Sequence, residues 1–164
     1  GSNDEFRDVL LTDAPGEWFA SWAVKEQAPD AEGARWIVQR ADAFLVLADC
    51  QRLGGPNRGR ARNDIRQLLE RLGNHVGVRP TTLVWSKADR EPDAAIRKQV
   101  CVSLRDSIPR ATEADCTTMN RTSLVRAMEA VLRPAWTPPR ARALVEPVLH
   151  DEPFAAFRGR DAHA

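Results

Sequence analysis

Three short apolar runs, each followed by polar residues, constrain the fold of this 164-residue chain more than any other feature. The runs are residues 8–12 (DVLLT), 43–48 (AFLVLA) and 81–85 (TTLVW). They are continuous rather than alternating and are rich in Val, Leu, Phe and Thr, a pattern typical of strands buried on both faces of a parallel sheet. The runs therefore predict three strands of a parallel sheet.

Longer polar segments with one apolar stripe lie between and after these runs. Apolar side chains recur at helical spacing in residues 61–72, 94–107 and 122–132. The last of these helices is expected to start at Thr122 or Ser123 as its N-cap and to end at Pro134. A fourth strand is expected around residues 114–119. Strands that alternate with helices of this length predict a three-layer α/β fold with a mostly parallel sheet.

The length favours one compact domain, which we expect at residues 6–133. Residues 134–164 contain Pro134, Pro138, Pro139, Pro147 and Pro153, so we expect a Pro-rich C-terminal extension that packs on the domain and holds a short helix near residues 141–145.

Composition excludes several classes of protein. The 24 Lys and Arg against 23 Asp and Glu give a net charge of +1, which indicates no general binding to nucleic acid. The three cysteines form no C-x-x-C pair, which disfavours a zinc ribbon or a disulfide framework and makes a reducing cytoplasm the expected location. No apolar run is long enough for a membrane span.

Ligands of open parallel sheets bind at the carboxyl ends of the strands. The first run is followed by Asp13-Ala14-Pro15-Gly16 and the third by Ser86-Lys87-Ala88-Asp89, so we expect both segments at the same edge. They resemble the D-x-x-G and [NT]-K-x-D motifs of translation-factor-like (TRAFAC) P-loop GTPases, with Ser in the first place of the second motif. Over residues 13–22 (DAPGEWFASW) and 151–159 (DEPFAAFRG) the chain also resembles bacterial double-GTPases of prokaryotic conflict systems.

This resemblance implies a P-loop GTPase-like core over roughly residues 8–132, with GTP or GDP and Mg²⁺ as ligands. By the family pattern, Asp13 would hold Mg²⁺ through a water molecule and Gly16 would let a backbone N–H approach the terminal phosphate. Ser86, Lys87 and Asp89 would bind guanine, with Asp89 accepting two hydrogen bonds that adenine cannot donate and the stem of Lys87 lying along the base.

The sequence departs from the family at the phosphates. It contains neither G-x-x-x-x-G-K-[ST] nor a first switch, so the core would lack its first βα unit. Two hydrogen bonds to the base give about 3–6 kcal/mol, whereas association costs about 4–15 kcal/mol, so this chain alone is expected to bind GTP only at millimolar concentration and to be inactive as a hydrolase. Either a GTP-binding switch obtains its phosphate-binding half from elsewhere in the native chain or from a partner, or a nucleotide-free pseudo-GTPase serves as an assembly module for an unidentified protein.

Other features favour structural roles. Trp18, Phe19 and Trp22 form an aromatic ridge on a helix, for which core packing is favoured over a partner surface. Residues 52–62 carry four arginines and are expected to be a mobile, solvated surface loop rather than a phosphate site. The cysteines suit buried structural thiols, and no catalytic set of side chains can be assembled.

Overall fold

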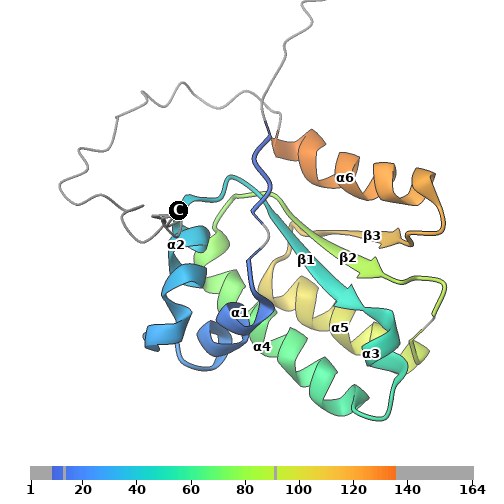
Figure 1. The fold of residues 1–164 in the computed structure, drawn as a ribbon, viewed down its shortest axis with the longest axis horizontal. Coiled ribbons are helices and arrows are strands. Elements are labelled where there is room, and N and C mark those ends of the chain that lie inside the picture. Colours follow the sequence, from blue (N-terminus) through green and yellow to red (C-terminus); the bar gives the residue numbers. More distant parts are fainter. Residues whose placement is uncertain (1–8, 13, 91, 136–164) are drawn as a thin grey trace, which may run out of the picture.

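The computed structural model describes residues 9–12, 14–90 and 92–135, which form three strands and seven helices (Figure 1). In chain order the elements are α1 (Gly16–Val24), the 3-10 helix η1 (Pro29–Ala31), α2 (Glu32–Arg40), β1 (Phe44–Asp49), α3 (Cys50–Gly54), α4 (Arg58–Val76), β2 (Thr81–Ser86), α5 (Ala94–Ser107), β3 (Thr112–Cys116) and α6 (Arg121–Ala135).

The strands form one open parallel sheet in the order β1-β2-β3. Phe44 of β1 is in register with Thr81 of β2, and Thr82 is in register with Thr112 of β3. The strands predicted at 43–48 and 81–85 are confirmed as β1 and β2. The strand expected around 114–119 is also present, but it begins at Thr112 and ends at Cys116.

The main core lies between one face of the sheet and the helices α4 and α5. β1 contributes Phe44, Val46 and Ala48 to this face, and β2 contributes Leu83 and Trp85. Helices α4 and α5 contribute Leu69, Leu72, Val76, Ile96, Val100 and Leu104 to the same core. These residues occupy the helical spacing expected from the sequence, so hydrophobic burial holds both helices on the sheet.

Helix α6 covers part of the opposite face, which completes the three layers (Figure 1). Ala127 and Val131 of α6 are buried, and Thr82 of β2 donates from Oγ1 to the Ala130 carbonyl at 3.4 Å. The structure thus has the three-layer α/β architecture with a parallel sheet that the sequence predicts, in agreement with a partial P-loop GTPase-like core.

Strand β1 lies at one edge of the sheet that the described residues form. It pairs with β2 alone among the described residues, and α6 packs on β2 and β3. Leu45 and Leu47 lie in register with the buried Thr82 and Val84, yet they are 36% and 61% exposed. Among the described residues, the sheet therefore ends on an apolar strand whose outer row of backbone hydrogen-bonding groups has no strand partner.

The strand predicted at residues 8–12 is wrong over the part that the structure describes. Residues 9–12 have no regular secondary structure, and Val9, Leu10 and Leu11 are 44%, 93% and 66% exposed. A strand needs a neighbour to pair its backbone groups, and the described residues of this segment pair with no strand of the sheet. Apolar composition alone was therefore insufficient to predict a strand in this segment.

Two local predictions are also corrected. Helix α6 begins at Arg121, one residue before Thr122, because the side chain of Asn120 caps the helix by accepting from the backbone N–H of Thr122 at 2.9 Å. The helix also includes Pro134 rather than ending before this residue. The basic segment at residues 52–62 is mostly helical, being shared between α3 and α4, rather than a loop. The predicted extension beyond Ala135 lies outside the described residues.

The prediction that the aromatic ridge packs in the core is confirmed for Trp22, which is 1% exposed. Phe19 packs against the core at its margin and meets the Trp22 ring edge-on at 6.4 Å. Trp18 is 40% exposed, and its ring lies so close to Gly33 of α2 that a Cβ there would come within 2.2 Å of it. The ridge joins α1 to the rest of the fold.

Candidate functional site

The carboxyl ends of the three strands place three polar segments along one edge of the sheet. β1 ends at Asp49, β2 ends at Ser86 and continues into Lys87, and β3 ends at Cys116 and continues into Thr117. Asp49 and Ser86 are register partners, as are Ser86 and Cys116. Parallel pairing therefore brings side chains together that lie far apart in the sequence.

The Ser86–Asp89 loop follows the central strand and is fixed by both neighbouring strands. The Ser86 hydroxyl donates to the Ala48 carbonyl of β1 at 3.3 Å, and the Ala88 N–H donates to the Cys116 carbonyl of β3 at 3.1 Å. The Arg90 N–H closes the turn on the Lys87 carbonyl at 2.8 Å. The loop is thus a rigid part of the sheet edge.

Asp89 presents a half-exposed carboxylate at this edge. The Thr117 hydroxyl donates to its Oδ1 at 2.9 Å, and the Arg90 Nε lies 3.7 Å from its Oδ2. The Asp89 side chain is 46% exposed, so its oxygens keep room for further donors. Thr117 orients the carboxylate from the end of the adjacent strand.

Lys87 points in the other direction, toward β1. Its Nζ lies 2.8 Å from Asp49 Oδ2 and donates to Gln51 Oε1 at 3.1 Å. Burial acts to raise the pKa of the Asp49 carboxyl, but the hydrogen bonds from Lys87 and from the Arg52 N–H outweigh it, and the pKa is lowered overall. Asp49 is therefore an anion at neutral pH, and its Oδ1 also caps α3 through the Arg52 N–H at 3.2 Å.

The first predicted motif is only partly described. Asp13, the expected Mg²⁺ ligand, lies outside the described residues. Gly16, the expected phosphate neighbour, is the first residue of α1, which packs on η1, α2 and α4. A Cβ added at Gly16 would meet no atom within 4 Å, so space beside this backbone is open. The predicted meeting of Asp13 with Asp89 at one edge stays a prediction.

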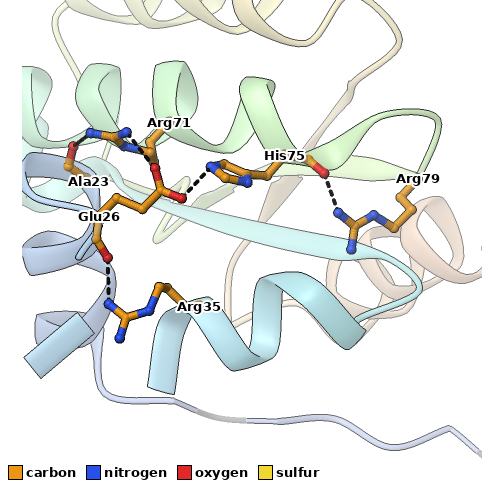
Figure 2. Close-up of polar contacts among 6 residues, drawn as sticks. All are labelled: Ala23, Glu26, Arg35, Arg71, His75 and Arg79. Atoms are coloured by element: carbon orange, nitrogen blue, oxygen red, sulfur yellow. Dashed lines mark hydrogen bonds and ion pairs between the residues drawn. The ribbon is translucent and has the colours of Figure 1, made fainter. Parts of the chain in front are cut away.

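A second polar cluster ties α1 and α2 to the end of α4 (Figure 2). The Glu26 carboxylate lies 3.1 Å from Arg71 Nη1 and 3.3 Å from His75 Nε2, and Arg35 donates to the Glu26 carbonyl at 2.6 Å. Arg79 donates to the backbone carbonyl of His75. Because α4 ends where β2 is about to begin, this cluster lies toward the amino ends of the strands and acts as a structural clamp.

The burial expected for the cysteines is confirmed for Cys50, whereas Cys101 and Cys116 are only partly buried. Cys50 is buried, and burial raises its pKa. Burial, together with the Glu113 carboxylate that accepts from Sγ at 3.1 Å, raises the pKa of Cys101 to about 11. In the described ranges no three His, Cys, Asp or Glu side chains gather in a way that could hold a metal ion. Within the same ranges no helix is long and apolar enough to cross a membrane.

The sequence pattern identified the Ser86–Asp89 loop but not the side chains that hold it. Asp49 and Gln51 contact Lys87, and Thr117 contacts Asp89. Asp49 could have been predicted from the sequence, because it directly follows the predicted strand at 43–48, at the position where ligand-binding residues are expected. Gln51 and Thr117 carried no comparable signal, since their roles depend on strand order.

The parallel sheet with a braced polar loop at its carboxyl edge defines a GTPase-like α/β domain. The model of the family Double-GTPase 2 (DO-GTPase2) matches residues 1–137, and the chain belongs to this family. Comparison with curated proteins and with solved structures gave no match.

Proposed function

We propose that this chain is the guanine-binding part of a GTP-dependent switch domain. The observation that carries the proposal is the Ser86–Asp89 loop, which ends the central strand with Asp89 braced by Thr117 and Lys87 braced by Asp49. A carboxylate with open acceptor sites suits the N1–H and exocyclic amino group of guanine, whereas adenine presents an acceptor at N1. Membership of a double-GTPase family supports the same ligand.

The residues that the structure describes fit a guanine base better than they fit phosphates or Mg²⁺. Asp89 and Lys87 offer an acceptor and an apolar stem at one edge. In this proposal Asp13 would hold Mg²⁺, and the backbone at Gly16 would contact the terminal phosphate. When bound, Mg²⁺ would neutralise phosphate charge. The sequence lacks G-x-x-x-x-G-K-[ST], so most of the phosphate affinity must come from another segment.

The free edge of β1 supports the idea that a second segment completes the site. A strand added parallel to β1 would satisfy its unpaired backbone groups, and a helix following that strand could cover Leu45 and Leu47. The loop between them would then emerge at the same edge as Asp49 and Lys87. This arrangement would place a phosphate-binding loop next to the proposed base site.

The alternative function is a nucleotide-free pseudo-GTPase that acts as an assembly module. The observation that favours it is the same missing phosphate loop, because about 3–6 kcal/mol from the base only reaches the lower end of the association cost of about 4–15 kcal/mol, which limits this chain alone to millimolar affinity. Asp13 and Asp89 would then be remnants. The exposed Leu45 and Leu47 edge would be the surface that contacts another protein, in the cytoplasm and in a bacterial conflict system if the resemblance extends to the pathway.

Thermal unfolding with and without nucleotide distinguishes the two functions. The full native open reading frame that contains this chain is melted alone, with GTP and Mg²⁺, and with ATP and Mg²⁺. A ligand at 100 times its Kd adds about 2.7 kcal/mol to the free energy of unfolding, so a GTP-specific rise of several degrees is expected for the switch. No rise, together with no saturation by a fluorescent GTP analogue below a millimolar, would favour the assembly module and overturn the proposal.

A further inference from the structure

The Ser86–Asp89 loop is braced at both ends by different elements. At one end, Lys87 Nζ contacts Asp49 Oδ2 at 2.8 Å and Gln51 Oε1 at 3.1 Å. At the other end, Asp89 accepts from Thr117 Oγ1 at 2.9 Å. The Lys87 side chain therefore reaches from β2 toward the end of β1, while Asp89 turns toward the end of β3.

The backbone at Lys87 has an unfavourable conformation. Its φ of +54° lies in the left-handed region, and among the described residues it is the sole non-glycine with a positive φ. Such a conformation costs about 1–3 kcal/mol and persists only where surrounding contacts impose it. The contacts here are the two side-chain bonds of the ammonium and the hydrogen bond from the Arg90 N–H to the Lys87 carbonyl.

Asp49 is the fixed member of its pair with Lys87. Its side chain is 28% exposed against 51% for Lys87, and its second carboxylate oxygen is held by the Arg52 N–H. A free lysine samples many rotamers, and ordering it costs up to about 2 kcal/mol of side-chain entropy. The contacts of the Lys87 ammonium with the Asp49 carboxylate and the Gln51 amide oxygen offset this entropy loss in the free protein. The Lys87 stem is therefore ordered before a ligand binds.

We infer that Asp49 and Gln51 are positioning residues for the nucleotide base. By holding the Lys87 ammonium, they lay its methylene stem across the sheet edge as an apolar support for a purine whose polar edge is bound by Asp89. The inference rests on the proposed function, since it names residues that prepare the guanine site. Neither residue contacts the base itself, so both act through Lys87.

The test measures binding of GDP to this chain by the amide chemical shifts of residues 87–89, with ADP as the comparison. In the weak-binding range the initial slope of shift against GDP concentration is inversely proportional to Kd. Asp49→Asn keeps an acceptor for the α3 cap but removes the charge, and we expect its slope to fall about tenfold, the loss of one charge-assisted hydrogen bond. Gln51→Ala should lower it about threefold.

Two controls separate positioning from general structure. Asp42→Asn removes an exposed carboxylate near the amino end of β1 and should leave the slope unchanged. Lys87→Met keeps the stem but removes the ammonium, and in this background Asp49→Asn should have no further effect, because Asp49 acts through Lys87. A merely structural role for Asp49 would give the same loss in both backgrounds.

Each outcome decides a different point. GDP-selective shifts in the wild type with an unchanged or steeper slope in Asp49→Asn would overturn this inference and leave the proposed function standing. An equal Asp49→Asn loss in the Lys87→Met background would also overturn it. Shifts that do not distinguish GDP from ADP, or no shifts at all, would overturn the proposed function and this inference with it.

Discussion

Asp89 is the residue on which the proposed choice of base depends. Its carboxylate can only accept hydrogen bonds, and Thr117 fixes one of its oxygens. The base that pairs with it must therefore donate from two adjacent positions. Ser86 donates its hydroxyl hydrogen to the Ala48 carbonyl, so this side chain ties two strands together, and its contact with guanine stays a prediction.

Replacing Asp89 with Asn should change the preferred base from guanine to xanthine. The Asn carbonyl can accept from N1–H while its amide donates to the xanthine 2-oxo group, and guanine would then face donor against donor. We expect the ratio of guanine to xanthine nucleotide affinity to fall by about tenfold or more. Competition binding with GDP and XDP measures it. An Asp89→Asn protein that keeps its guanine preference would exclude the proposed role of Asp89.

Cys101 should be an unreactive thiol. Its pKa is raised from 9.0 to about 11, so the thiolate is disfavoured at every pH below that value. At pH 8 the thiolate fraction should be about 100-fold lower than for a thiol of ordinary pKa. Alkylation by iodoacetamide, followed by peptide mapping, should increase about tenfold per pH unit from pH 7 to pH 9.5 without a plateau.

The Glu113 carboxylate is part of the cause of this raised pKa, so its removal gives a control. Glu113→Gln should label faster at Cys101, because the negative charge that opposes the thiolate is gone. Asp106→Asn, at an exposed carboxylate on the same helix, should label like the wild type. A plateau near pH 9 in the wild type would contradict the raised pKa.

At the scale of elements, the close packing of α4 on α5 depends on one glycine. A Cβ at Gly73 would lie 2.4 Å from the Ser107 backbone carbonyl oxygen at the end of α5. Glycine is a poor helix former, so its presence within α4 is explained by this approach rather than by local propensity. The 3.6-residue spacing predicted both helices, but it could not predict where their backbones meet.

Gly73→Ala should destabilise the protein despite its better helix propensity. The added methyl group must push α5 away, and overpacking of this kind costs about 1–3 kcal/mol, more than the gain of about 1 kcal/mol from replacing glycine in a helix. Gly59→Ala in the same helix is the matched control. A Cβ at Gly59 would meet no atom within 4 Å, so this change should stabilise by up to about 1 kcal/mol. Urea unfolding measures both, and a stabilised Gly73→Ala protein would refute the packing argument.

At the scale of the whole molecule, the described helices cover one face of the sheet and only part of the other. β1 has six residues without Lys or Pro, so it lacks the features that usually protect an edge strand. Its exposed Leu45 and Leu47 continue the apolar face that α6 covers over β2 and β3. Such an edge is expected to pair with another polypeptide.

Leu47→Lys should therefore reduce self-association of this chain. A lysine at a position that is 61% exposed should change the free energy of unfolding by no more than about 0.5 kcal/mol, while its charge opposes edge-to-edge pairing. Light scattering over a concentration series measures the effect. Val78→Lys, at a residue that is 83% exposed outside the sheet, supplies the control. Equal behaviour of the two variants would show that the β1 edge is not the associating surface.

The sequence by itself determined the elements whose signals are local. The continuous apolar runs at 43–48 and 81–85 and the helical spacing at 94–107 were correct, because strand composition and the 3.6-residue period act over neighbouring residues. The Ser86–Asp89 motif was likewise identified from its residues and its place after a strand. Tertiary structure alone decided the rest. The run at 8–12 is not a strand over its described part, where it pairs with no strand of the sheet. Asp49, Gln51 and Thr117 join the site because strand order brings separate chain segments within hydrogen-bonding distance. Pairing and proximity depend on contacts distant in sequence, which a local pattern does not encode.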